Sequence, residues 1–186
     1  MEPRPIRVVH YGLGAIGSAI ARLTAAQRGL EVVGGIDRDP AKAGRDLGDV
    51  IGLGRQLNTI VSDNATELLL RAHPDVVIHA TTSLFHQVYS QILDCAAARA
   101  NVISTCEELV YPYAKAAVAS EKLNHLAMLS GVTVLGAGVN PGFVMDLLPL
   151  LLTAPCLAVF LAFSEPLLPR GIRIRDARSA ISRRNA

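Results

Sequence analysis

Short runs of β-branched residues alternate with longer, alanine-rich segments, and this alternation limits the possible folds of the chain more than any other feature. Strands are predicted at residues 6–11, 31–36, 75–80, 101–105 and 132–136, with a weaker one at 59–61. Helices are predicted between them, at residues 15–27, 66–72, 86–98 and 113–130. The strand runs are nearly continuous in apolar residues, with little alternation, which is typical of strands covered on both faces. The pattern therefore predicts an α/β fold with a doubly wound parallel sheet.

A glycine-rich stretch, "GLGAIG", joins the first predicted strand to the first predicted helix. Gly12 permits a tight turn, Gly14 lets the backbone approach a pyrophosphate, and Gly17 allows the helix to pack closely on the strand. The backbone amides of Ala15 and Ile16 would then face the phosphates at the positive end of the helix. We therefore expect a Rossmann-type domain that binds NAD or NADP.

Asp37 and Arg38 follow the second predicted strand, and they affect the choice between NAD and NADP. Asp37 lies 20 positions beyond Gly17, where a carboxylate accepts hydrogen bonds from the ribose hydroxyls of the adenosine. Arg38 can pair with a 2′-phosphate or stack on adenine. The carboxylate favours NAD, and the arginine leaves NADP open.

Further candidate residues lie in the loops beyond the carboxyl ends of later strands, where an open parallel sheet binds its ligands. Thr81, Thr82 and Ser83 offer hydroxyl groups near a cofactor ribose, although Ser83 equally well caps the helix that follows. In "GAGVNPG", Asn140 can hold the nicotinamide carboxamide, and a plain turn is the alternative.

Two adjacent carboxylates, Glu107 and Glu108, follow the predicted strand at residues 101–105. Alternate residues of an extended segment point to opposite sides, so we expect only one of the two to face the cleft. The alternative is a pair of solvated glutamates at the start of a helix, where the helix dipole favours them.

Composition excludes several other classes of function. The three cysteines match neither a zinc site nor a redox C-x-x-C motif, so we expect no metal and reduced thiols in a cytoplasmic protein. The net charge of +2 comes from six arginines after residue 169. Because the first 150 residues carry no basic stripe with interleaved aromatics, nucleic acid is not an expected partner.

Three stretches, "GLGAIG", "STCEELVYP" and "GAGVNPGFVMDLLPLLLTAPC", together resemble the N-terminal half of the 2,4-diaminopentanoate dehydrogenase and native amine dehydrogenase family, relatives of the dihydrodipicolinate reductases. The resemblance runs from about residue 6 to 156. It implies a Rossmann domain followed by an α+β substrate domain, a homo-oligomer, and NAD(P)-dependent interconversion of small amines or amino acids with ketones and ammonia. It also implies that a glutamate of the CEE motif, Glu107 or preferably Glu108, stands beside the nicotinamide and the reacting C–N centre, where it orients the amine and exchanges protons.

The end of the chain departs from the family from residue 157 onward. We expect a dinucleotide-binding domain at residues 1–145 and a remnant helix with an unselected or disordered tail at 146–186. The substrate domain would then be missing through truncation, and turnover impaired. A dihydrodipicolinate reductase-like enzyme and a non-catalytic NAD(P)-binding module are the alternatives.

An uncharged apolar run at residues 147–163 is the most conspicuous feature of this end. Its length is borderline for a membrane span, and two prolines weaken a continuous helix, so a membrane is an unlikely partner. We expect a core helix left without its partner and hence self-association of the chain.

Overall fold

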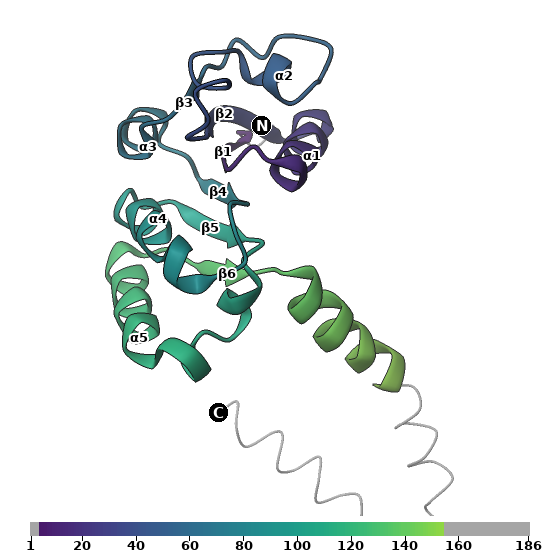
Figure 1. Ribbon diagram of the computed structural model, residues 1–186, viewed down its shortest axis with the longest axis vertical. Helices are drawn as coiled ribbons and strands as arrows, with labels where there is room; N and C mark the ends of the chain where they lie inside the picture. The colour runs from purple at the N-terminus through teal and green to yellow at the C-terminus, as the bar shows by residue number, and fades with distance from the viewer. Residues whose placement is uncertain (1–3, 155–186) are drawn as a thin grey trace, which may run out of the picture. The chain divides into compact units, whose positions relative to one another are not determined.

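The computed structural model describes residues 4–154, and the chain divides into two compact units, Met1–Asp146 and Leu147–Ala186. The first unit contains six parallel strands in the order β3-β2-β1-β4-β5-β6 (Figure 1). The strands are β1 (Ile6–Tyr11), β2 (Leu30–Ile36), β3 (Val61–Ser62), β4 (Val76–His79), β5 (Asn101–Ser104) and β6 (Val134–Gly136). This arrangement confirms the predicted doubly wound parallel sheet.

Helices connect the strands and pack on both faces of the sheet (Figure 1). The helices predicted from sequence are α1 (Ala15–Ala26), α3 (Ala65–Ala72), α4 (Phe85–Ala97) and α5 (Tyr113–Ser130). Three short elements were not predicted: α2 (Leu47–Val50), the 3₁₀ helix η1 (Glu107–Val110) and the π-helix η2 (Val139–Leu147). Residues 136–142 were expected to form a loop, but residues 139–142 belong to η2.

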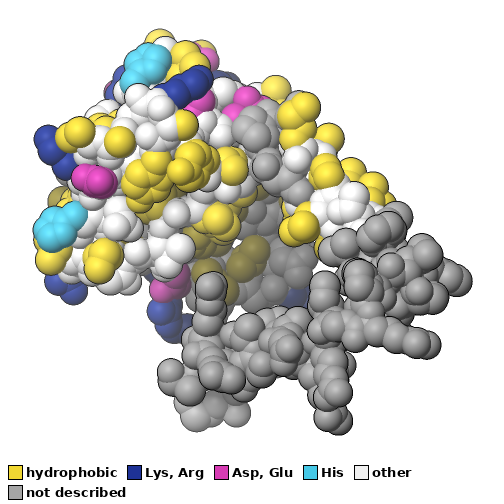
Figure 2. Space-filling view, turned by 90° about the horizontal axis from the view of Figure 1, so that it is seen from below, with side chains coloured by type: hydrophobic (Ala, Val, Ile, Leu, Met, Phe, Trp, Pro, Cys, Tyr) yellow, Lys and Arg dark blue, Asp and Glu magenta, His cyan; other side chains and the backbone are white. Residues whose placement is uncertain are grey.

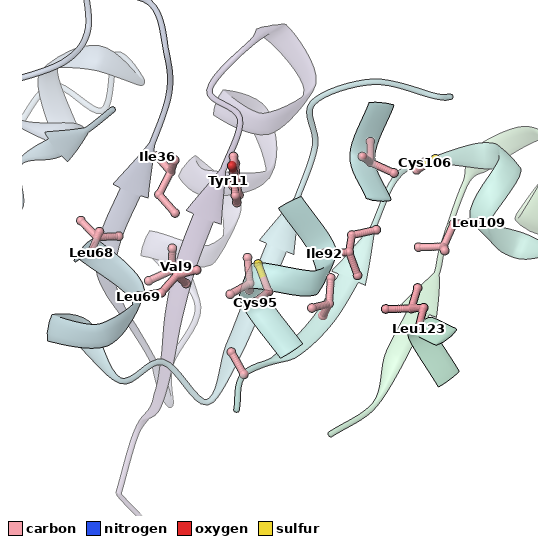
Figure 3. Close-up of a cluster of buried hydrophobic side chains, with 14 of the residues drawn as sticks. Val9, Tyr11, Ile36, Leu68, Leu69, Ile92, Cys95, Cys106, Leu109 and Leu123 are labelled. Carbon is pink, nitrogen blue, oxygen red and sulfur yellow. The ribbon is translucent and has the colours of Figure 1, made fainter. Parts of the chain in front are cut away.

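The main hydrophobic core lies between the sheet and the layer of α3, α4 and α5. Figure 3 shows Val9 and Tyr11 of β1 facing Leu69 of α3 and Cys95 of α4. Two glycines of β2 let helices approach both faces. A Cβ at Gly34 would lie 2.7 Å from Leu68 Cδ2 of α3, and one at Gly35 would lie 2.9 Å from Leu47 Cδ1 of α2.

The face of the sheet opposite α3, α4 and α5 is covered unevenly by helices. Ile78, Ile103 and Leu135 form one row across β4, β5 and β6, and the side chains of the last two are 41% and 52% exposed. The apolar strands were expected to be covered on both faces, but among the described residues no helix shields this row. Other large apolar side chains are also exposed, and Figure 2 shows such side chains on one face of the molecule.

Two buried histidines have different surroundings. His79 is buried in β4 and hydrogen-bonded through both ring nitrogens. His10 of β1 is also fully buried, but neither of its ring nitrogens has a hydrogen-bond partner in the described part of the chain. Burial lowers the pKa of His10 from 6.5 to about 4.

The second unit is described only over residues 147–154, which are helical from residue 148. The leucines at 150, 151 and 152 are all more than half exposed. No helix within residues 4–154 is long and apolar enough to cross a membrane. The rest of the apolar run, Cys156 and the predicted tail lie outside the described residues.

Candidate functional site

The loop between β1 and α1 has a shape that only glycine allows at two positions. Gly12 adopts a φ of +91°, and a Cβ there would lie 2.8 Å from the carbonyl carbon of Ala80 and from Thr81 Cγ2. A Cβ at Gly17 would collide with the carbonyl oxygen of Gly12. The loop is therefore folded tightly against α1 and the end of β4.

Gly14, in contrast, faces open space. It is the N-cap of α1, and a Cβ placed on it would meet no atom within 4 Å. The first hydrogen bond of the helix runs from Ser18 N–H to the Gly14 carbonyl, so the amides of Ala15 and Ile16 have no acceptor within the helix. These donors, at the positive end of the helix dipole, can hold an anionic group of a ligand.

Asp37 closes the other side of the loop. Its carboxylate accepts hydrogen bonds from the amides of Leu13 (2.8 Å) and Asp39 (2.9 Å) and pairs with Lys42 Nζ at 2.9 Å. Burial alone would raise the pKa of Asp37, but these hydrogen bonds outweigh it and lower the pKa. Lys42 also lies 3.6 Å from the carboxylate of Asp39. Asp37 is thus an anion near neutral pH, with most of its acceptor positions occupied.

A cavity of about 300 Å³ runs along this loop. Asp37, Arg38 and Lys42 line it after β2, Gly12 and Gly14 line it after β1, and Ala80 and Thr81 line it after β4. The remaining lining residues are Tyr11, Ile36 and, from α4, Gln91. We call this cavity the glycine-loop pocket.

A second, larger cavity of about 600 Å³ lies beside the carboxyl end of β5. It is lined by Ser83 to His86 at the start of α4, by η1 and by the beginning of α5. Glu107 and Glu108 both line it. We call it the glutamate pocket.

The conformation of the two glutamates differs from the expected one. The segment is not extended: it forms the 3₁₀ helix η1, so the two side chains are not forced to opposite sides, and both reach one cavity. A Cβ at Gly136 would lie 2.6 Å from the backbone of Leu109 and Val110. This close contact with the end of β6 fixes the position of η1.

Glu108 is held by groups that flank the glutamate pocket. One carboxylate oxygen accepts the Phe85 N–H of α4 at 2.8 Å, and the other pairs with Lys115 Nζ at 2.8 Å. The hydrogen bond from Lys115, followed by that from Phe85, lowers the pKa of Glu108. The carboxylate of Glu107 has no hydrogen-bond or ion-pair partner among the residues that the structure describes.

The family follows from comparison with known proteins. Residues 6–106, more than half of the chain, match the family model described as the N-terminus of dihydrodipicolinate reductase. The chain belongs to this family.

Individual relatives extend the match to about 80% of the chain and confirm the resemblance given by its motifs. The 2,4-diaminopentanoate dehydrogenase of Acetoanaerobium sticklandii is 32% identical over 152 residues, which are 81% of this chain and 43% of that protein. The amine dehydrogenase of Streptomyces virginiae is 29% identical over 80% of this chain and 42% of that protein. The solved structure of amine dehydrogenase from Mycobacterium smegmatis matches with 40% sequence identity and a TM-score of 0.68. The match covers 70% of this chain and 38% of the chain in that structure. The chain therefore spans less than half the length of these relatives.

The structure brings most of the predicted cofactor-binding residues to one edge of the sheet. Gly12, Gly14, Asp37, Arg38 and Thr81 all line the glycine-loop pocket, and Ala15 and Ile16 begin α1 beside it. No hydrogen bond of the Thr82 side chain is seen within the described residues. Asn140 lies in the π-helix η2, and its side chain is outside the described part.

Ser83 does not cap α4, so that alternative is wrong. The N-cap is Leu84, and the carboxylate of Glu108 accepts the amide of Phe85 instead. The carbonyl of Ser83 accepts hydrogen bonds from Glu108 N–H at 3.3 Å and Cys106 Sγ at 3.1 Å. These bonds tie the loop after β4 to η1.

Sequence reasoning missed two polar residues of the glycine-loop pocket, Lys42 and Gln91. Gln91 belongs to a stripe with the buried Val88, Ile92 and Cys95 at helical spacing. A polar residue inside an apolar stripe is a usable signal in the sequence. Lys42 offers no comparable signal, since it lies in an irregular segment whose path brings it back to Asp37.

Proposed function

We propose that this chain carries the cofactor site and the carboxylates of an NAD(P)-dependent oxidoreductase that acts on the C–N bond of an amine or amino acid. The reaction is oxidative deamination in one direction and reductive amination in the other. The cofactor is NAD or NADP, and the substrate is a small molecule.

The observation that carries the proposal is the shared wall of the two pockets. The loop after β4 borders the glycine-loop pocket through Ala80 and Thr81 and the glutamate pocket through Ser83. A dinucleotide bound at the start of α1 can therefore extend along this loop toward Glu107 and Glu108. The relatives named as dehydrogenases of amines and of 2,4-diaminopentanoate support the substrate class.

The residues present fit the pyrophosphate of a dinucleotide. The open space at Gly14 is the volume that a side chain would fill, and the amides of Ala15 and Ile16, which have no acceptor within α1, follow Gly14 directly in the chain. Asp37 and Arg38 follow β2, where the adenosine of such ligands lies. When bound, the nicotinamide would take hydride from the carbon that bears the amine, or return it.

The two glutamates would divide charge stabilisation and proton transfer between them. Glu108, held as an anion by Lys115 and Phe85, stabilises the positive charge of the iminium formed at the C–N centre. The carboxylate of Glu107 has no partner within residues 4–154, so it can accept a proton from the substrate amine and return it. Water then adds to the iminium carbon, and ammonia leaves to give the ketone.

Two other functions fit the same fold. A dihydrodipicolinate reductase-like reaction is favoured by the family match over residues 6–106. A module that binds NAD(P) without catalysis is the other alternative.

The test combines binding and turnover on the full chain. Titration calorimetry with NADH and NADPH is expected to give saturable binding, and reduction of NAD⁺ or NADP⁺, followed by absorbance, is expected to depend on an added amine such as 2,4-diaminopentanoate. Binding without amine-dependent reduction would support the non-catalytic module. Absence of binding to either dinucleotide would refute the proposal.

A further inference from the structure

A chain of hydrogen bonds, buried at Ser104 and His79 and partly exposed at Thr81, fixes the orientation of Gln91. Ser104 Oγ accepts the amide of Cys106 at 3.1 Å and lies 2.9 Å from His79 Nδ1. His79 Nε2 lies 2.7 Å from Gln91 Oε1. Thr81 Oγ1 lies 3.1 Å from His79 Nε2 and 2.8 Å from Gln91 Oε1.

The proton positions in this chain follow from burial. Ser104 is fully buried, and His79 Nδ1 is the acceptor within reach of its hydroxyl proton. Nδ1 therefore accepts, and the single proton of the neutral imidazole resides on Nε2. Burial also lowers the pKa of His79, which keeps the ring neutral.

The orientation of the Gln91 amide follows in turn. His79 Nε2–H and the hydroxyl of Thr81 both donate to Gln91 Oε1, so the carbonyl oxygen points inward. The amide nitrogen, Nε2, has no partner among the described residues, and Gln91 lines the glycine-loop pocket. The side chain therefore presents an oriented, unused N–H donor to that pocket.

We propose that Gln91 is a cofactor-binding residue whose amide nitrogen donates a hydrogen bond to an acceptor on the adenosine half of the dinucleotide. This inference rests on the proposed function. The adenosine half is indicated because Gln91 shares its pocket with Asp37, Arg38 and Lys42, which follow β2. Adenine ring nitrogens and ribose oxygens are acceptors that match such a donor. Thr81 and His79 act as positioning residues that keep the side-chain amide of Gln91 from flipping by 180°.

The decisive variant is Gln91→Glu. A carboxylate at this position still accepts from His79 Nε2–H and from the Thr81 hydroxyl, so the chain of hydrogen bonds survives, but the donor to the pocket is lost. Gln91→Met removes the donor without adding charge. Gln87→Glu is the matched control, because Gln87 is exposed, belongs to the same helix and lines neither the glycine-loop pocket nor the glutamate pocket.

The probe is ADP-ribose, which contains the adenosine and pyrophosphate but no nicotinamide, measured by titration calorimetry on the full chain. Both Gln91 variants are expected to bind it about tenfold more weakly, the effect of one lost hydrogen bond in a desolvated site. Gln91→Glu should retain the melting temperature of the parent, and Gln87→Glu should bind within about twofold of it.

The outcomes separate this inference from the proposed function. If the parent chain binds ADP-ribose and both Gln91 variants bind it equally well, the assignment of Gln91 is wrong and the dinucleotide site stands. Weaker binding by Gln91→Glu alone would show charge repulsion and would likewise overturn the assignment. If the parent chain binds neither ADP-ribose nor NAD(P)H, both proposals are refuted.

Discussion

Replacement of Gly14 by valine tests the cofactor site without disturbing the fold. Gly14 has φ −70° and ψ −168°, a conformation open to a β-branched residue, and its Cβ would meet no atom within 4 Å. Loss of glycine at an N-cap costs roughly 1 kcal/mol, and the reduced freedom of the unfolded chain returns about half of that. The melting temperature should therefore change by no more than about 4 °C.

The effect on binding should be far larger. A valine side chain would fill the space that a pyrophosphate needs and separate it from the free amides of α1. Loss of two charge-assisted hydrogen bonds, at about 1.5 kcal/mol each, weakens binding about a hundredfold. Calorimetric titration with NADH and NADPH, together with thermal unfolding of the same samples, measures both quantities.

Gly17→Val is the contrasting variant. Its Cβ would collide with the Gly12 carbonyl, so α1 must move, at a cost of roughly 1–3 kcal/mol and about 5–10 °C in melting temperature. We expect a stable, non-binding Gly14 variant and a destabilised Gly17 variant. A Gly14→Val protein that binds NADH within a few fold of the parent would refute the placement of the pyrophosphate.

Three other predictions concern different parts of the molecule. His10→Leu should flatten the pH dependence of the free energy of unfolding. The pKa of His10 is about 4 in the folded chain and 6.5 in the unfolded chain, so the unfolded chain binds more protons between these pH values. The parent should therefore lose up to about 3 kcal/mol of stability as the pH falls from 6.5 to 4, which urea titrations at both pH values measure. Lys42→Ala should weaken NADPH binding more than NADH binding, since a 2′-phosphate would lose a cation and face Asp37 uncompensated; equal losses in calorimetry would contradict this. Glu107→Gln should lower amine-dependent reduction of NAD(P)⁺ about a hundredfold and leave dinucleotide affinity within about twofold, and an unchanged rate would exclude Glu107 as the proton acceptor.

The sequence by itself determined the sheet, four of the helices and the glycine loop. These features depend on local signals: apolar runs of strand length, helical periodicity and glycines at positions where a side chain would collide. The positive φ of Gly12 and the contact at Gly17 are such local requirements. The cofactor assignment drawn from them remains a prediction.

Only the tertiary structure decided which side chains meet at the site. The 3₁₀ turn at Glu107 and Glu108 depends on contact with β6, and the partners of Glu108 come from two other helices. Gln91 reaches the glycine-loop pocket from α4, and Lys42 reaches it from an irregular segment. The exposed row of Ile78, Ile103 and Leu135 likewise depends on which helices cover the sheet. Most of these contacts join residues far apart in the chain, and the others depend on the path of irregular segments, so periodicity and local dihedral preferences carry no information about them.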